Sequence, residues 1–179
     1  MTRALVIFES MFGNTQRIAE AVKEGLSVLM PTELLEVGTA PTVIGDDVGL
    51  LVVGGPTHAF GMSRPRTRED ATRQADGHVV SEGNGLREWL GSAARRTGDT
   101  SAAAFDTRID KPRVPGSAAH GAQKRLRKLG FDIAAPSESF YVTGTAGPLV
   151  EGEVERARRW GEELGKRYVG DLRAAQGAR

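Results

Sequence analysis

The chain has 179 residues, of which 39% are hydrophobic and 26% are charged, as expected for one globular domain with a core. Its 24 Lys and Arg residues nearly balance 23 Asp and Glu residues, so the net charge gives no reason to expect nucleic-acid binding. The lack of cysteine excludes disulfides, thiolate nucleophiles and cysteine-ligated metals. No window approaches the ~20 apolar residues of a membrane span, and the N-terminal apolar run is too short for a signal peptide, so we expect a cytoplasmic protein.

The first thirty residues predict a strand, a short polar loop and a helix. Residues 4–8 form a continuous apolar run, which is typical of a strand buried on both faces of a parallel sheet. The polar segment 10–15 follows, and apolar residues then recur at helical spacing before Pro31, which cannot continue a helix. Such a loop directs backbone N–H groups and the positive end of a helix dipole at one point, so it suits an anion such as a phosphate.

The rest of the chain continues the alternation of strands and helices. Apolar runs predict further strands at 33–37, 49–53 and 101–105, and a last strand over 132–142 that is interrupted near Pro136. Helical spacing predicts helices at 86–96, at 116–129 and from residue 150 onward. No linker divides the chain, so we expect a single domain over 1–170 and a frayed C-terminal tail at 171–179.

The segment 62–85 is polar and contains little apolar material, which predicts an extended surface loop with one helical turn near 68–74. Its basic residues Arg64, Arg66 and Arg68 follow directly after the loop 56–61. Three interpretations of this basic stretch stay open: a solvated loop, a mobile lid, and a docking site for an acidic partner or an anionic substrate.

Alternating strands and helices predict an α/β protein with a parallel sheet and right-handed crossovers. Ligands bind such sheets beyond the carboxyl ends of the strands, where the strand order reverses. The loops 10–15, 56–61 and 106–117 should therefore converge on one site. A dinucleotide or a nucleoside triphosphate is not expected there, because neither G-x-G-x-x-G nor G-x-x-x-x-G-K-[ST] occurs.

Two motifs in this order carry a resemblance to a known family. The sequence Ser-Met-Phe-Gly-Asn-Thr at 10–15 resembles the flavodoxin phosphate loop, usually written [ST]-x-T-G-N-T, and Gly-Gly-Pro-Thr-His at 54–58 is similar to the flavodoxin loop after the third strand. The resemblance extends along nearly the whole chain. It implies an α/β, flavodoxin-like three-layer sandwich with a five-stranded parallel sheet of order 2-1-3-4-5, and it implies FMN as the cofactor.

The same resemblance implies the cofactor-binding residues, with no catalytic residue and no metal ligand. The phosphate would lie over Ser10, Met11, Phe12, Gly13, Asn14 and Thr15. One side of the flavin would be lined by Pro56, Thr57, His58, Ala59, Phe60 and Gly61, and the other by Thr107 and Arg108.

The chain departs from the flavodoxin pattern at two places. Phe12 replaces the usual threonine, which removes one hydroxyl donor and predicts weaker phosphate binding. The loop after the fourth strand lacks the aromatic residue that usually stacks on the flavin, and instead carries Arg108, Lys111 and Arg113. The rim would therefore be basic, whereas flavodoxins that carry electrons usually have an acidic rim.

Several side chains have more than one reading. His58 could lie beside the flavin, serve in acid–base chemistry or bond to the backbone, and Phe60 could stack on the flavin or anchor its loop. Trp89 and Trp160 lie in helical patterns, which favours packing over contact with the flavin, and Asp106 could cap a turn or meet the flavin edge.

The first functional hypothesis is an FMN-binding redox protein that transfers electrons through the flavin to a redox partner protein. Because the rim would be basic, an acidic partner is favoured. The second is an FMN-dependent oxidoreductase that acts on a small-molecule substrate, either a quinone or an anionic porphyrinogen. The third is a flavodoxin-like domain that has lost the cofactor and binds a partner.

Overall fold

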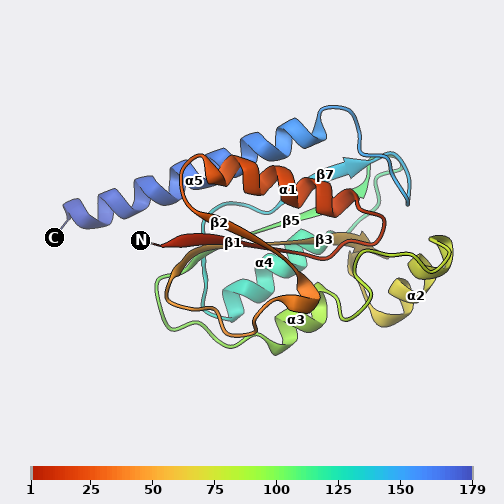
Figure 1. Ribbon diagram of the computed structural model, residues 1–179, viewed down its shortest axis with the longest axis horizontal. Helices are drawn as coiled ribbons and strands as arrows, with labels where there is room; N and C mark the ends of the chain where they lie inside the picture. Colours follow the sequence, from red (N-terminus) through yellow and green to blue (C-terminus); the bar gives the residue numbers. More distant parts are fainter. Residues whose placement is uncertain (1, 179) are drawn as a thin grey trace.

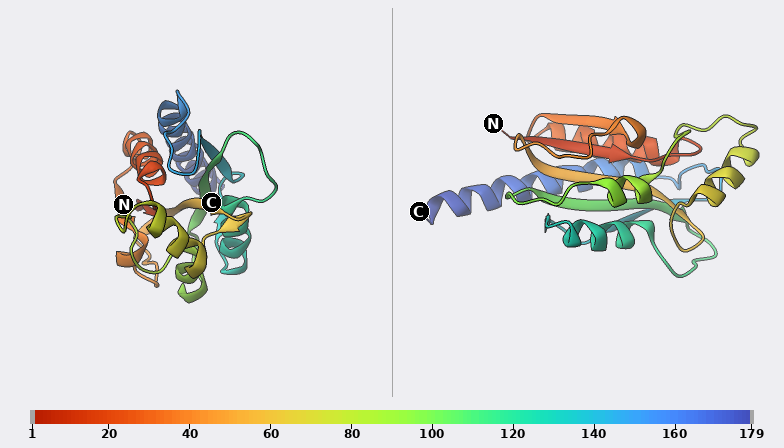
Figure 2. Two further views of the ribbon diagram at one scale, coloured as in Figure 1. Left: turned by 90° about the vertical axis from the view of Figure 1, so that its right-hand side faces the viewer. Right: turned by 90° about the horizontal axis from the view of Figure 1, so that it is seen from below.

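The computed structural model describes residues 2–178 and shows a parallel sheet between two layers of helices (Figures 1 and 2). The main strands lie in the order β2 (Thr32–Glu36), β1 (Arg3–Phe8), β3 (Val48–His58), β5 (Ser101–Ile109) and then β6 (Asp132–Ile133) and β7 (Glu138–Val142). Both β6 and β7 pair with β5, so together they form an interrupted fifth strand. The predicted α/β class and the order 2-1-3-4-5 are confirmed.

Helices cover both faces of the sheet (Figure 2). One face carries α1 (Asn14–Ser27) and α5 (Glu153–Gly177), and the other carries α3 (Leu86–Ser92) and α4 (Ala118–Lys128). Alternate residues of β1 serve the two cores, since Val6 packs with α1 and α5 while Ile7 packs towards α3 and α4. The short 3-10 helix η1 (Val37–Thr39) follows β2.

Buried aromatic residues fill the core as the helical spacing predicted. Trp160 packs edge-on against Phe105 and Phe140, with ring centroids about 6 Å apart. Trp89 is buried in the opposite core and its indole N–H donates to the carbonyl of Pro41. The packing interpretation of both tryptophans is therefore confirmed.

The largest difference from the prediction is α2 (Pro65–Gln74), a complete helix where a loop with one helical turn was expected. It lies beyond the carboxyl ends of the strands rather than against the sheet (Figure 1). Proline at its first position and a hydrogen bond from the N–H of Arg64 to the hydroxyl of Thr67 define its start. The helix lacked an apolar stripe in the sequence because it buries little more than Arg68 and Ala71.

Other boundaries also differ from the sequence prediction. The strands β3 and β5 continue to residues 58 and 109, so residues expected in loops are strand residues, and β3 turns back into the short antiparallel β4 (Gly61–Met62). The helix α3 ends at Ser92 rather than near residue 96. The expected tail at 171–179 was wrong as far as Gly177, because α5 continues through it and projects beyond the body (Figure 1). Within residues 2–178, no helix has the length and apolar character needed to cross a bilayer.

Candidate functional site

A cavity of about 260 Å³ opens at the carboxyl ends of β1, β3 and β5. The three loops that were expected to converge do meet there. The predicted residues that line it are Ser10, Met11, Phe12, Asn14, Thr15, Pro56, Thr57, His58, Ala59, Thr107 and Arg108. Gly13, Phe60 and Gly61 belong to the same loops but do not line the cavity.

The segment 10–15 places the start of α1 at one end of the cavity. Ser10 is fully buried, and its hydroxyl oxygen accepts the N–H of Gly13 at 3.1 Å, which leaves the hydroxyl hydrogen free to donate. Gly13 has a φ of +92°, a left-handed conformation that favours glycine. The N–H groups of the first helical turn, from Asn14 on, have no intrahelical acceptor and face this end of the site.

The segment 80–81 holds the loop 10–15 in place through hydrogen bonds to the loop's backbone. The N–H groups of Val80 and Ser81 donate to the carbonyls of Met11 and Ser10, at 3.0 and 2.8 Å. The N–H of Ser10 donates in turn to the hydroxyl of Ser81 at 3.0 Å. On the other side, the amide of Asn14 donates to the carbonyl of Ala146 at 3.0 Å. The loop is thus held by its neighbours in one conformation before any ligand binds.

At the opposite end, β3 and β4 form a tight hairpin around Ala59 and Phe60. Both residues have positive φ values, +42° and +75°, which cost roughly 1–3 kcal/mol each for residues other than glycine. Gly116 packs directly on the turn, because a Cβ added there would lie 2.0 Å from the carbonyl oxygen of Phe60. The Phe60 side chain is 62% exposed at the hairpin tip and is not part of the cavity wall.

Asp106 joins the ends of β3 and β5 to the start of α4. Its Oδ2 accepts hydrogen bonds from the hydroxyls of Thr57 and Ser117 and from the N–H of Ala119. The prediction that Asp106 caps a turn is confirmed, and a carboxylate at this position also suits the positive end of the α4 dipole. The hydroxyl of Thr57 additionally accepts the N–H of Ala118, so both hydrogen bonds of this hydroxyl join β3 to Asp106 and to the start of α4.

His58 lies on the cavity wall as a neutral side chain. Its Nδ1 is 3.0 Å from the hydroxyl oxygen of Thr67 in α2. Burial, and then the positive charge of Arg68, lower the pKa of His58 from 6.5 to about 4. The imidazole therefore carries no charge at neutral pH and offers one donor and one acceptor nitrogen.

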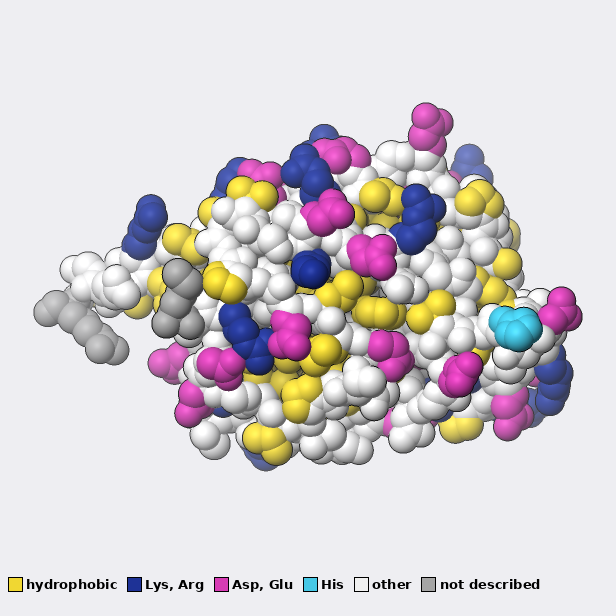
Figure 3. Space-filling model, viewed as in Figure 1, with side chains coloured by type: hydrophobic (Ala, Val, Ile, Leu, Met, Phe, Trp, Pro, Cys, Tyr) yellow, Lys and Arg dark blue, Asp and Glu magenta, His cyan; other side chains and the backbone are white. Residues whose placement is uncertain are grey.

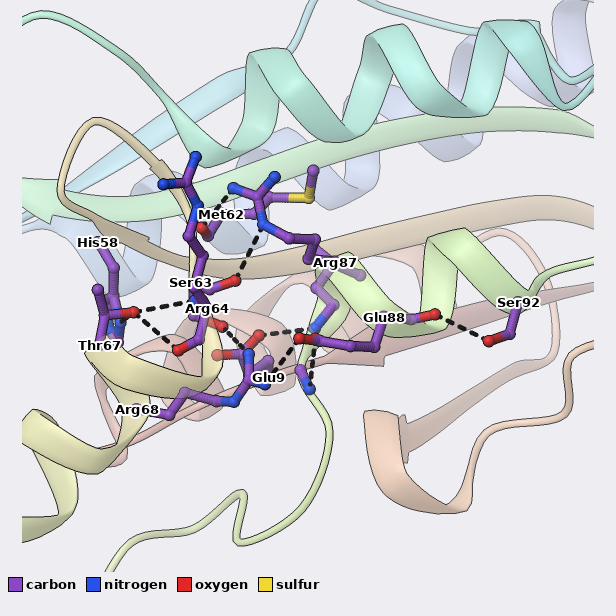
Figure 4. Close-up of polar contacts among 12 residues, drawn as sticks. Glu9, His58, Met62, Ser63, Arg64, Thr67, Arg68, Arg87, Glu88 and Ser92 are labelled. Carbon is purple, nitrogen blue, oxygen red and sulfur yellow. Dashed lines mark hydrogen bonds and ion pairs between the residues drawn. The ribbon is translucent and has the colours of Figure 1, made fainter.

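A buried polar cluster fixes α2 beside the cavity (Figure 4). The Arg68 side chain points from α2 towards α3, where its guanidinium donates to the hydroxyl of Ser63 at 2.9 Å and to Oε1 of Glu88 at 2.8 Å. Burial opposes ionisation of Glu88, but the hydrogen bond from Arg68 and those from backbone N–H groups outweigh it, so the pKa of Glu88 is lowered. Arg68 is only 8% exposed, so the solvated-loop and mobile-lid interpretations are wrong for this arginine.

Glu9 completes this cluster from the end of β1. It is fully buried, its Oε1 accepts the N–H of Leu86 at 2.7 Å, and its Oε2 has no hydrogen-bond partner in the described part of the chain. Burial raises the pKa of the Glu9 carboxyl. Arg68 is thus balanced mainly by Glu88, with Glu9 shifted towards its neutral form.

The sequence prediction missed the residues that complete the cavity wall. They are Thr67, Asp70, Ala71 and Gln74 of α2, together with Ile109, Val142 and Thr145. The first four follow the helical spacing i, i+3, i+4 and i+7, which is the one signal that could have revealed them. It was overlooked because the stripe is mostly polar.

Comparison with solved structures identifies the fold. The chain is similar to a flavodoxin from the domain Archaea, at 17% identity and a TM-score of 0.63 over 93% of this chain and 99% of that one. It is also similar to oxidised flavodoxin 1 from Bacillus cereus, at 18% identity and a TM-score of 0.65 over 92% and 98% of the two chains. The flavodoxin of Streptococcus pneumoniae TIGR4 matches at 17% identity and a TM-score of 0.65, over 93% and 99%.

These likenesses show that the chain has the flavodoxin-like fold, as the two sequence motifs predicted. No protein-family model and no curated protein matches the sequence. The ligand must therefore be argued from the residues of the site.

Replacing Arg68 by methionine tests the anchor of α2. The change leaves Glu88 and Ser63 without their buried partner, so we expect a loss of about 3 kcal/mol in the free energy of unfolding, measured by urea denaturation. Amide hydrogen exchange over Pro65–Gln74 should become faster. Arg66→Met is the control, because Arg66 is exposed on the same helix; equal effects of the two changes would contradict the anchor.

His58 predicts a pH dependence of stability. Its pKa in the folded protein, about 4, lies below its ordinary value of 6.5, so the unfolded chain binds more protons between these values. Stability should therefore fall as the pH falls from 6.5 towards 4. Urea denaturation at about pH 7.5 and about pH 5 should show a larger loss for the wild type than for His58→Gln. The exposed His78→Gln should behave like the wild type, and a pH-independent difference between wild type and His58→Gln would contradict the shift.

Proposed function

We propose that the protein binds FMN and transfers electrons through it to a partner at the carboxyl edge of the sheet. The observation that carries this proposal is one cavity that unites the start of α1 with the ends of β3 and β5. A helix start that receives an anion and a partly apolar opposite end are the two features that a phosphorylated flavin requires. Similarity to flavodoxins supports the same ligand.

The phosphate end of the site depends on N–H donors rather than on basic side chains. The unpaired N–H groups at the start of α1, the free hydroxyl hydrogen of Ser10 and the amide of Asn14 surround the anion position. The hydroxyl of Thr15 is 2.7 Å from that of Thr107, so one of the two can donate to a ligand while accepting from the other. Phe12 contributes no hydroxyl, which reduces the donor set without removing it.

The ring end combines apolar contacts with the neutral His58 and with Arg108, whose guanidinium donates to the carbonyl of Val114. Pro56, Ala59 and Ile109 supply apolar surface, and His58 remains neutral beside them. FMN itself supplies the electron-transfer chemistry, while the protein orients it and limits its contact with water. The cavity lies just below the roughly 300 Å³ at which ligand pockets usually begin, so part of a flavin would stay at the surface, as electron transfer to a partner requires.

Titration with FMN and riboflavin tests the cofactor. We expect the flavin absorbance to shift and its fluorescence to change on binding, with FMN bound about tenfold more tightly because only its phosphate meets the start of α1. Equal affinities would contradict the phosphate position. No spectral change with either flavin would overturn the proposal and favour the alternative of a partner-binding domain without a cofactor.

The rim of the cavity is basic. Arg64 and Arg66 are exposed beside the hairpin, and Lys111 is exposed on the loop after β5, while Arg113 is paired with Asp110. The two segments adjoin, because Gly116 packs on the turn at Phe60. The exposed cations Arg64, Arg66 and Lys111 attract anionic groups of a partner, which supports an acidic redox protein as the acceptor.

Small redox ions of opposite charge test this rim. Reduced, flavin-loaded protein should reduce the anion ferricyanide more slowly as the ionic strength rises, whereas its reaction with the cation hexaamminecobalt(III) should become faster. The double substitution of Arg64 and Arg66 by glutamine should weaken both salt effects. The same change at Arg127 and Lys128, on the exposed face of α4, is the control. Salt effects of the same sign for both ions would contradict a basic rim.

A further inference from the structure

The cavity-facing stripe of α2 is polar, unlike the inner face of an ordinary helix. Thr67, Asp70, Ala71 and Gln74 line the cavity, and Ala71 is the single apolar member. Asp70 and Gln74 are also exposed to solvent, whereas Ala71 is buried. Figure 3 shows that charged side chains of both signs gather on the outer surface at this end of the molecule, so the helix is polar on both sides.

The stripe begins beside the ring end of the site. Near the start of α2, the hydroxyl of Thr67 contacts Nδ1 of His58, which belongs to the ring end. After α2 ends, Val80 donates to the carbonyl of Met11, which belongs to the phosphate end. Asp70 and Gln74 line the same cavity about one and two helical turns further along α2 than Thr67.

The stripe is also held in place. Arg68 lies on the neighbouring face of the same helix and is bound to Ser63 and Glu88 on the side away from the cavity (Figure 4). Asp70 itself has one modest contact, 3.2 Å from Oδ1 to the guanidinium of the exposed Arg73. The Asp70 side chain is 53% exposed, and its carboxylate keeps free acceptor capacity at the cavity wall.

We propose that Asp70 and Gln74 bind the hydroxyl groups of the polyol chain that links the flavin ring to the phosphate. This inference rests on the proposed function. A carboxylate would repel the phosphate, whereas polyol hydroxyls donate to a carboxylate and exchange both kinds of hydrogen bond with an amide. The flavin ring also offers polar groups on its pyrimidine edge, so a ligand that has the ring alone is needed to separate ring contacts from polyol contacts.

Three flavins separate the parts of the ligand. Lumiflavin has the ring alone, riboflavin adds the polyol, and FMN adds the phosphate. Asp70→Ala should weaken the binding of riboflavin and of FMN by the same factor of about 10, as expected for the loss of a hydrogen bond to a charged group. Gln74→Ala should weaken the binding of both by a smaller factor, again the same for the two flavins. Neither change should alter lumiflavin binding by as much as twofold.

Control variants separate the loss of the Asp70 contact from a change in net charge, in the helix or in folding. Glu69→Ala removes the same charge one residue away, beside the same Arg73 but outside the cavity wall, and should leave all three affinities unchanged. Asp70→Asn retains the size and one acceptor of the side chain, so it should give a smaller loss than Asp70→Ala. Circular dichroism and the thermal midpoint establish that each variant is folded.

The other outcomes overturn the inference in distinct ways. Tighter FMN binding by Asp70→Ala, with riboflavin unchanged, would place Asp70 at the phosphate. An equal loss for lumiflavin would place the stripe at the ring, and unchanged affinities would remove α2 from the site. A wild-type protein that binds none of the three flavins would instead overturn the proposed function itself.

Discussion

The guanidinium of Arg68, buried between α2 and α3, is the contact on which the candidate site depends. A buried arginine is stable only when its charge and its N–H groups are matched, and here Glu88 and Ser63 provide the match. Because α2 buries little apolar surface, this polar cluster rather than a hydrophobic face holds the helix at the carboxyl edge of the sheet. Without it, the cavity would lose the wall formed by Thr67, Asp70, Ala71 and Gln74.

Charge is divided between the regions of the site. The anion end offers backbone N–H groups and the dipole of α1, while Arg108, which also lines the cavity, donates to the carbonyl of Val114. The exposed cations Arg64, Arg66 and Lys111 lie on the rim instead. A phosphate held by N–H groups leaves these cations free of the cofactor, so the rim keeps its positive charge when the site is loaded. The choice of cofactor and the choice of partner can thus be made by different residues.

The sequence was sufficient for the architecture because each of the main parallel strands left a periodic or continuous apolar signal, whereas the short β4 left none. Even the interrupted fifth strand was visible around Pro136. The loops were predictable for the same reason, since the carboxyl ends of neighbouring parallel strands must meet. The helix α2 was not predictable by apolar spacing, because it is anchored by Arg68, a residue type that is normally exposed. The positive φ at Ala59 and Phe60 was equally hidden, since neither residue type favours it.

Phe12 and α2 would have opposite effects on the affinity for FMN. In the proposed complex, phenylalanine at this position removes a hydroxyl from the loop that would hold the phosphate, while Asp70 and Gln74 of α2 would add hydrogen-bonding groups for the polyol. Contacts to the polyol stabilise riboflavin and FMN alike, so they raise affinity without distinguishing the two. Discrimination in favour of FMN then falls to the start of α1 and the hydroxyls beside it. The segment 80–81, which holds the loop 10–15 in place, therefore matters more for selectivity than for overall affinity.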